Sequence, residues 1–265
     1  MMKALPLGTL VISVDVERGC DRQDRQESSL ANRVLATLAR AELPSTIGLT
    51  QPGCNRHTDG LLAEFPTAEL ALLAEESWAG QAARRRQFAA GLSRNVLRAA
   101  AAGYAIRTLV FPGDVQQAHS DLLIKHGISV LRGEPRVAVQ PRLKSILRRF
   151  SGEASSLLVE PRNIRYGLWE VPCAASLPGT PGSVLRAWID RAAETRGILH
   201  LRIDVPGLLR DTRGGLVELG RVVEQAASRR DQHRLRIATL CELADRAQPR
   251  RIAAPAQSIL RVRAA

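Results

Sequence analysis

The sequence predicts a single α/β domain in which a mostly parallel sheet is wrapped by helices. Short β-branched and apolar runs alternate along the chain with amphipathic stretches of helical periodicity, which is the pattern of strands joined by crossover helices. With 265 residues, the chain is long enough to bury a substantial core. Its composition, 45% hydrophobic and 24% charged, is that of an ordinary globular protein.

The expected elements follow from hydrophobic periodicity and from the residues that begin and end helices. The strands are expected at residues 9–14, 45–49, 69–74, 106–111, 128–131, 168–171, 198–203 and 235–238. The helices are expected at residues 29–41, 81–102, 120–125, 183–197, 216–229 and from 239 onward. Ser183 is expected to cap one helix, and Thr239 and Glu242 have the spacing of a capping box. Residues 133–165 are the least regular part of the chain.

The first expected strand ends in two acidic residues, Asp15 and Glu17. The carboxyl ends of strands form the edge at which α/β sheets and barrels build their sites. These two carboxylates are therefore the first candidates for catalysis or metal binding. The alternative is a structural pair that is hydrogen-bonded to neighbouring loop amides.

Arginine supplies most of the net charge of +12 and gathers in short clusters. Such clusters attract nucleic acid, an anionic polymer or an acidic membrane surface, but they are also typical of solvated helix faces. No cluster carries a nucleic-acid motif or interleaved aromatic residues, and aromatic residues make up only 3% of the chain. We therefore expect solvated arginine faces rather than a nucleic-acid-binding site.

The four cysteines are far apart and form no C-x-x-C pair: Cys20, Cys54, Cys173 and Cys241. This spacing predicts reduced thiols rather than a zinc ribbon or a disulfide framework. The apolar run at residues 5–14 lacks a strongly basic leader, and no run of about 20 apolar residues is present to span a membrane. The expectation is a soluble cytoplasmic protein.

Several segments occur in an order and spacing that indicate a known family. Residues 10–17 (LVISVDVE) read as a strand followed by an acid, a spacer and a second acid. The other segments are residues 35–46 (LATLARAELPST), 107–112 (RTLVFP), 119–127 (HSDLLIKHG), 199–204 (LHLRID) and 229–244 (RRDQHRLRIATLCELA). Together they resemble the NodB-homology polysaccharide deacetylases. The resemblance assigns residues 1–246 to one domain and leaves residues 247–265 as a basic C-terminal tail.

The resemblance implies a distorted, incomplete (β/α) barrel of the glycoside hydrolase and deacetylase type. It also implies an ancestral activity, the removal of acetyl groups from N-acetylated sugars, with an acetylated carbohydrate or glycolipid as ligand. In this family a divalent metal, usually zinc, lowers the pKa of a bound water and polarises the acetyl carbonyl. An acid and the two histidines of an H-x-x-x-H segment hold the metal. A second acid is the general base, and a later histidine is the general acid.

The expected metal site is only partly present in this sequence. Asp15 matches the general base, Glu17 matches the acidic metal ligand, and His200 is a retained histidine and a candidate acid or base. The two metal-binding histidines fall on Leu73 and Ser77. Leucine cannot ligate a metal, and neutral serine is a poor zinc ligand. A zinc site of the usual type is therefore not expected, although the family implies one.

Two further departures concern the same end of the expected barrel. Gly113 and Asp114 stand at the Arg and Asn positions of the family's "F-P-R-N" segment. Glu75 and Glu76 could join Glu17 in an oxygen-rich site, which would suit magnesium, calcium or manganese better than zinc. The alternative for the two glutamates is an exposed acidic loop.

Three residues are candidates for substrate binding. Trp78 follows the altered histidine segment and could line a sugar cleft or belong to the core. His119 opens a helical segment, where a polar cap is the alternative role. Asp204 stands where the family has the second histidine of its "F-H-L-W-x-H-P" segment. His200, the first histidine of that segment, could instead be a satisfied histidine packed within its strand.

The sequence leaves three functions open. The first is a carbohydrate-active deacetylase with an altered or absent metal. The second is a non-catalytic descendant that binds a glycan or a partner protein in polysaccharide or cell-envelope metabolism, which the loss of both metal histidines favours. The third is a basic module that binds nucleic acid or another polyanion. It rests on charge alone and would show binding that weakens steeply with added salt.

Overall fold

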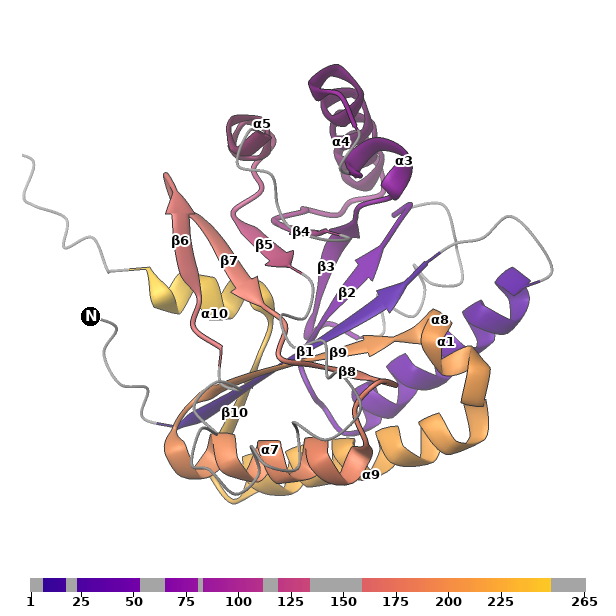
Figure 1. Cartoon of the computed structure of the whole chain (residues 1–265), viewed down its shortest axis with the longest axis vertical. Helices are drawn as coiled ribbons and strands as arrows, with labels where there is room; N and C mark the ends of the chain where they lie inside the picture. The colour runs from indigo at the N-terminus through magenta and orange to yellow at the C-terminus, as the bar shows by residue number, and fades with distance from the viewer. Residues whose placement is uncertain are drawn as a thin grey trace, which may run out of the picture.

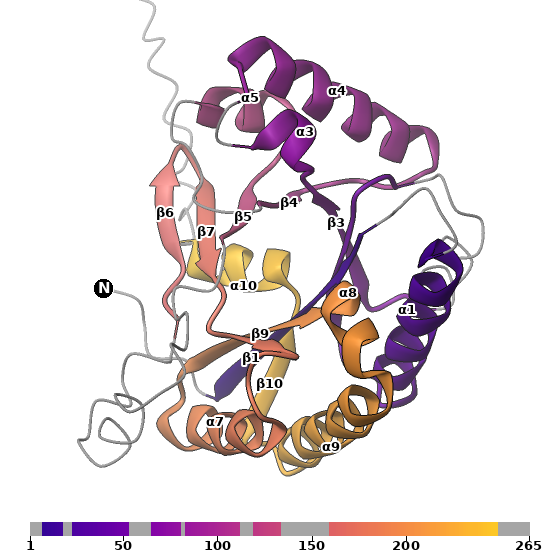
Figure 2. The same ribbon diagram turned by 45° about the vertical axis from the view of Figure 1, so that its right-hand side comes forward.

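The computed structural model describes residues 7–17, 23–52, 65–80, 83–111, 119–133 and 159–248. In these residues a strongly curled sheet carries helices along its outside (Figure 1). Helices α1, α9 and α7 follow one another along one side of the sheet, and α3, α4 and α5 lie along the other side (Figure 2). The expected distorted (β/α) barrel is thereby confirmed, and in the described residues its sheet forms a half-barrel.

The strands form one sheet in the order β6-β7-β5-β4-β3-β2-β1-β9-β8, with β10 paired to β1. Their bounds are β1 (Gly8–Val16), β2 (Ser45–Leu49), β3 (Ala68–Leu73), β4 (Thr108–Val110), β5 (Val130–Gly133), β6 (Arg162–Arg165), β7 (Leu168–Pro172), β8 (Ala175–Leu177), β9 (Ile198–Asp204) and β10 (Leu235–Ala238). Only β6 runs antiparallel to its neighbour among the strand pairs described. The parallel strands consequently present their carboxyl ends at one end of the half-barrel.

The helices of the described residues are amphipathic and vary widely in length. Their bounds are α1 (Gln23–Arg40), α3 (Glu76–Ala79), α4 (Arg85–Ala101), α5 (Ser120–Lys125), α7 (Gly182–Thr195), α8 (Val205–Leu208), the 3-10 turn η3 (Leu209–Asp211), α9 (Thr212–Asp231) and α10 (Leu240–Ala247). The expected apolar face of α1, built on Val34 and Leu38, is fully buried. None of the helices in these ranges is both long and apolar enough to cross a membrane.

Strand β1 is the centre of the sheet, and all nine of its residues are buried. One edge of β1 pairs with β9 from Thr9 to Asp15. The other edge is shared, because β10 pairs with its first half and β2 with its second half. This arrangement places Asp15 level with Gly48 on one side and with Asp204 on the other. The carboxyl end of β1 is therefore flanked by two strands that can contribute to a site.

The structure corrects several expected boundaries. Helix α1 begins at Gln23 instead of residue 29, and α9 begins at Thr212 instead of residue 216, because polar first turns carry no apolar periodicity. Ser183 does not cap α7, since the cap position is Pro181 and no side chain caps that helix. The capping box of α10 is confirmed, with Thr239 and Glu242 each accepting from the other's backbone N–H.

Other sequence expectations fall on short elements or outside the described residues. Strands β6 and β8 and helices α3 and α8 were not expected, because three or four residues are too few to show a period. Most of the irregular segment at residues 133–165 lies outside the described residues, as do Gly113, Asp114 and the basic tail after Gln248. The described cysteines, Cys173 and Cys241, are free and buried, as expected.

A half-buried carboxylate ties the amino ends of three strands to α10. Glu69 Oε2 on β3 accepts hydrogen bonds from Thr46 Oγ1 of β2 and from Cys241 N, both at 2.9 Å. Glu69 Oε1 accepts from Thr108 Oγ1 of β4. Thr46 Oγ1 in turn accepts from Leu240 N at 2.9 Å. This end of the half-barrel is therefore closed by a hydrogen-bond network, which leaves the carboxyl end as the place for a site.

We expect Glu69→Gln to lower the free energy of unfolding by about 2 kcal/mol, because the amide keeps one acceptor oxygen and turns an NH₂ group towards donors. Urea denaturation of the purified variant measures this loss. The matched control is Glu160→Gln at an exposed position, which should change stability by less than about 0.5 kcal/mol. Equal stability of the two variants would show that the network adds nothing.

Candidate functional site

Asp15 lies at the carboxyl end of β1 with both carboxylate oxygens engaged by arginines. Arg132 donates to Asp15 Oδ1 from Nη1 and to Oδ2 from Nη2, the latter at 2.6 Å. Arg202 Nε lies 2.7 Å from the same Oδ2. The side chains of Asp15 and Arg132 are each only 1% exposed. The centre of the site is thus a buried carboxylate held between two guanidinium groups.

A glycine on the neighbouring strand leaves the space for this carboxylate. A Cβ added at Gly48 would meet Asp15 Oδ1 at 3.4 Å and Val110 Cγ2 at 3.6 Å. Contacts at these distances are ordinary van der Waals contacts, so an alanine would fit here and only a larger side chain would push the carboxylate off its partners. The residue at position 48 thereby helps to set the position of Asp15.

Arg132 is the functional residue that sequence reasoning missed. It stands on β5, a strand whose residues are all buried, and the expected strand ended one residue before it. The available signal was a single arginine directly after an apolar run, at the carboxyl end of an expected strand, where the acids of the first strand also lie. A lone arginine at a strand end is more often solvated. Only the pairing of β5 within the curled sheet brings it to Asp15.

A hydrogen-bond chain runs from Arg132 below Asp15 into the barrel. Arg132 Nη1 donates to Ser13 Oγ at 3.1 Å, and Ser13 Oγ lies 2.9 Å from His200 Nε2. His200 Nδ1 lies 3.0 Å from the carbonyl oxygen of Pro172, which can only accept. His200 therefore carries its proton on Nδ1, and the Ser13 hydroxyl donates to Nε2. The imidazole is a fully satisfied, buried group.

The charges of the site fix the protonation states of its buried members. Burial and the positive charge of Arg132 lower the pKa of His200 to about 3, so the imidazole is neutral at neutral pH. Burial alone would raise the pKa of Asp15, but Arg132 and Arg202 outweigh it and hold that pKa below its ordinary value. Burial raises the pKa of the nearby Cys173 thiol to about 11. Asp15 is therefore ionised, while His200 and Cys173 are neutral.

Arg202 and Asp204 form the accessible rim above this buried centre. Both lie on β9, two residues apart, and their side chains are 17% and 30% exposed. Arg202 Nη2 lies 3.8 Å from Asp204 Oδ1, so Arg202 links the buried carboxylate to the exposed one. Glu17, directly after β1, is exposed. The rim offers guanidinium donors and carboxylate acceptors to a polar ligand.

The positions at which the family would hold zinc do not form a metal site. Leu73 is buried against Ala71 and Val110 and has no ligating atom. Ser77 is exposed, and its hydroxyl donates to Glu75 Oε2 at 3.2 Å. Within the described ranges no group of three His, Cys, Asp or Glu side chains could hold a metal ion. This holds also for the alternative set of Glu17, Glu75 and Glu76, so the donors described do not fit the implied metal.

Trp78 and His119 belong to an aromatic cluster around Phe88 of α4. Trp78 is 5% exposed and its ring centroid lies 5.7 Å from that of Phe88. His119 and Phe111 also stack on the ring of Phe88, with distances between ring centroids of 4.7 Å and 5.9 Å. Two of the three predicted substrate-binding residues thus pack with α4, whereas the third, Asp204, lies with Asp15, Glu17 and His200 around β1 and β9. Their role in substrate binding stays a prediction.

Comparison with solved structures confirms the expected fold. A protein from Mycobacterium smegmatis described as a polysaccharide deacetylase has a TM-score of 0.66 at 15% identity, covering 93% of this chain and 93% of that chain. A protein from Pseudomonas aeruginosa PAO1, also described as a polysaccharide deacetylase, has a TM-score of 0.60 at 10% identity over 90% of each chain. The Puue allantoinase has a TM-score of 0.61 at 12% identity, over 90% of this chain and 89% of that chain.

The likeness is one of structure alone. No family model matches the sequence, and no curated protein matches it. At identities of 10 to 15%, what is shared with these structures is the fold. The chain therefore has the distorted (β/α) barrel of the polysaccharide deacetylases, while its site must be interpreted from its own residues.

Arg132→Met should lower the free energy of unfolding by about 3–5 kcal/mol, because it leaves a buried carboxylate with one of its two cations. Asp15→Asn should also destabilise, and the double variant should lose at least about 2 kcal/mol less than the sum of the single losses. Urea denaturation of the four proteins measures this coupling. The control is Arg85→Met, which breaks an exposed pair with Asp121 and should cost less than about 1 kcal/mol. Additive losses would mean that Arg132 and Asp15 do not interact.

Stability should fall as the pH is lowered from about 6.5 towards 3, because the unfolded chain protonates His200 in this range while the folded chain does not. One such group contributes a slope of up to about 1.4 kcal/mol per pH unit. His200→Gln keeps an acceptor for Ser13 and cannot titrate. Urea denaturation between about pH 7 and pH 5 should therefore show a smaller slope for this variant. Identical slopes would contradict a buried, neutral His200.

Proposed function

We propose that this chain is a polysaccharide deacetylase-like protein of carbohydrate metabolism that binds an N-acetylated sugar at the carboxyl ends of β1 and β9. In this proposal it acts as a binding protein and does not hydrolyse the acetamide by the metal-dependent route of the family it resembles. The observation that carries the proposal is the engagement of both carboxylate oxygens of Asp15 by Arg132 and Arg202.

A general base needs a free lone pair within hydrogen-bond reach of the proton that it removes. The carboxylate of Asp15 is 1% exposed, both of its oxygens accept from Arg132, and Arg202 Nε lies 2.7 Å from Oδ2. The same cations lower the pKa of Asp15, which makes the carboxylate a weaker base. Geometry and basicity therefore both favour a structural role for this residue.

His200, the candidate general acid, does not suit the other catalytic role. A general acid must carry the proton that it donates, and His200 is neutral near pH 7 because its pKa is about 3. Its two ring nitrogens are occupied by Ser13 and by the carbonyl of Pro172. These contacts favour His200 as a positioning residue for the strands β1 and β9.

The rim has hydrogen-bond donors and acceptors of the kind that recognise a sugar. Sugar hydroxyls and the acetamide group both donate and accept hydrogen bonds, and charged partners make the strongest of these contacts. Arg202 and Asp204 supply a donor and an acceptor side by side at the accessible edge. Because the buried centre holds Arg202 through Asp15, the donor is fixed before a ligand arrives, which lowers the entropy cost of binding.

Hydrolysis is the second candidate, and one observation favours it. Asp15 is ionised, and the exposed Glu17 lies two residues beyond it, as in the family motif that the sequence resembles. A ligand that drew Arg202 away from Asp15 would leave the carboxylate paired with Arg132 alone and would open one side of Oδ2. The soluble, cytoplasmic location and the domain assignment to residues 1–246 stay predictions beside either candidate.

We expect a chitin tetramer to bind the purified protein with at least about tenfold lower affinity after Asp204→Ala, because a charged hydrogen-bonding group is lost. Isothermal titration calorimetry measures this binding. The control is Asp231→Ala, at an exposed position on α9, which should leave affinity unchanged. Equal affinities of the two variants, or no binding by the parent protein, would reject the proposed site.

The same samples separate binding from catalysis. With zinc, magnesium, manganese or cobalt supplied, we expect no release of acetate from the tetramer. Acetate release that is lost in Asp15→Asn would instead establish the second candidate. Because calorimetry measures sugar binding independently of acetate release, a negative result in one assay does not determine the result of the other.

A further inference from the structure

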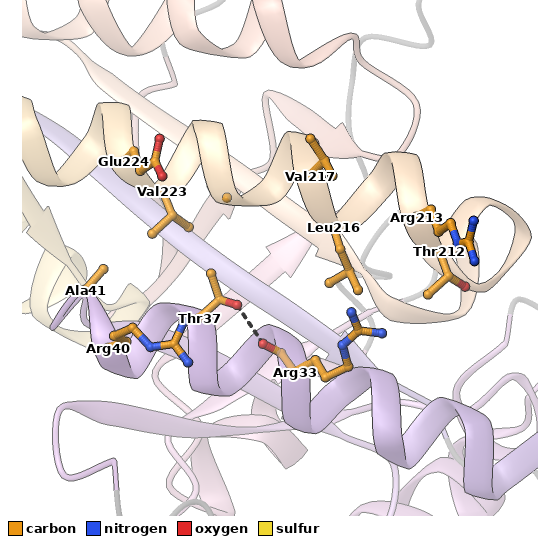
Figure 3. Close-up of a pocket in the computed structure, with 11 residues that line it drawn as sticks. Arg33, Thr37, Arg40, Ala41, Thr212, Arg213, Leu216, Val217, Val223 and Glu224 are labelled. Carbon is orange, nitrogen blue, oxygen red and sulfur yellow. Dashed lines mark hydrogen bonds between the residues drawn. The ribbon is translucent and has the colours of Figure 1, made fainter.

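A groove of about 730 Å³ runs along the outside of the half-barrel between α1 and α9 (Figure 3). Its lining extends on α9 from Thr212 to Glu224, which corresponds to about 18 Å of helix at the usual rise per residue. The opposite wall is the second half of α1, from Arg33 to Arg40. None of the residues that form the barrel-end site contributes to this groove.

The walls of the groove carry uncompensated positive charge. Arg33 and Arg40 of α1 and Arg213 of α9 line it, and all three are exposed. Within the described part of the chain no acid pairs with any of them. By contrast, Arg229 on the far part of α9 pairs with Asp190 at 2.7 Å. Glu224 is the single acid among the lining residues, so the groove has a net positive charge.

The floor of the groove is aliphatic and open. Leu216, Val217 and Val223 line it, and Val217 is 53% exposed, which is unusual for a valine on a packed helix. Gly220 lies between them, and a Cβ added there would meet no atom within 4 Å. A glycine in the middle of a helix is unfavourable for helix stability, and here it leaves the floor hollow.

We propose that the groove between α1 and α9 is a docking site for an acidic amphipathic helix of a partner protein. Such a helix presents aliphatic residues at spacings of three and four to the floor and carboxylates to the arginines on the walls. Its axis would lie between two parallel helices, where ridges of side chains can enter the open position at Gly220. A segment of about 12 residues matches the length of the groove.

Charge and surface chemistry argue against the other occupants. A second copy of the chain would place one basic groove against another, which is repulsive. The C-terminal tail at residues 249–265 carries arginines and no acids, so it does not complement the groove either. Nucleic acid would pair its phosphates with the arginines but would leave the exposed Val217 and the half-buried Leu216 uncovered. An acidic helix uses both the walls and the floor.

The first test changes the charge of the walls. The probe is a fluorescein-labelled 18-residue peptide of leucine and glutamate with leucines at helical spacing, and fluorescence anisotropy measures its binding to the full chain. Arg33→Glu/Arg213→Glu should weaken binding at least about tenfold. The control is Arg86→Glu/Arg94→Glu on the exposed face of α4, with the same change in net charge, which should weaken it less than about threefold. Equal losses in the two double variants would reduce the effect to overall charge and overturn the proposal.

The second test fills the floor and leaves the charge unchanged. Gly220→Trp places a large ring in the hollow part of the groove and should reduce peptide binding at least about tenfold. Gly220→Ala is the matched control and should bind like the parent protein. Circular dichroism shows whether each variant keeps its helical content. A folded Gly220→Trp protein with full affinity would show that the peptide does not use the groove.

Two further probes identify the class of partner. A lysine counterpart of the peptide should bind at least about tenfold more weakly than the glutamate peptide. A single-stranded oligonucleotide should not be displaced by the glutamate peptide. Failure of the parent protein to bind the glutamate peptide overturns the proposal. The proposal is also overturned if the oligonucleotide binds the parent protein more tightly than the peptide does and loses this affinity in the variant Arg33→Glu/Arg213→Glu.

Discussion

The buried carboxylate of Asp15 between the guanidinium groups of Arg132 and Arg202 is the interaction on which the carboxyl end of the half-barrel depends. Asp15 belongs to β1, Arg132 to β5 and Arg202 to β9. The side chain of Asp15 thereby links β1 both to its neighbour β9 and to β5, which is not adjacent to β1 in the sheet. Burying these charges is costly unless each is paired and hydrogen-bonded. Here Arg132 also donates to Ser13, which contacts His200, and Arg202 also lies beside Asp204 at the surface.

This pairing has a cost for chemistry. A carboxylate that is held at low pKa by two cations is stable as a structural anion, but it is weak and inaccessible as a base. The positions that would hold a metal in the family carry Leu73 and Ser77, and the described residues offer no group of ligands for a divalent cation. In this chain two arginines therefore provide the positive charge beside Asp15. The fold is that of the deacetylases, whereas the electrostatics of the site are its own.

The two proposed binding surfaces differ in the way they are supported. The rim at Arg202 and Asp204 lies on β9, which pairs with β1, and Arg202 is held there by its ion pair with the buried Asp15. The groove between α1 and α9 lies on the outer helical layer and combines an aliphatic floor with arginines that pair with no acid of the described ranges. Because the two share no lining residue, a ligand at one is not required for binding at the other. A protein with both surfaces could bring a carbohydrate and a protein partner together.

The sequence by itself determined the α/β class, the order of the main strands and the capping box of α10, because these depend on local periodicity and on side chains three residues apart. It also placed Asp15 and Asp204 at strand ends. The resemblance to the deacetylases supplied the half-barrel, which the comparisons confirm. The polar first turns of α1 and α9 and the short strands β6 and β8 gave no periodic signal, so they could not be predicted.

Only the tertiary structure decided what the candidate residues contact. Arg132 is 117 residues from Asp15 along the chain, and no local pattern relates an arginine on β5 to an acid on β1. The curl of the sheet brings them together, and the same curl buries His200 and lowers its pKa. Trp78 and His119 were expected near a ligand, but the packing of α4 places them around Phe88. Pairing across a sheet and burial are properties of the whole fold, which is why a motif could name Asp15 but not its partners.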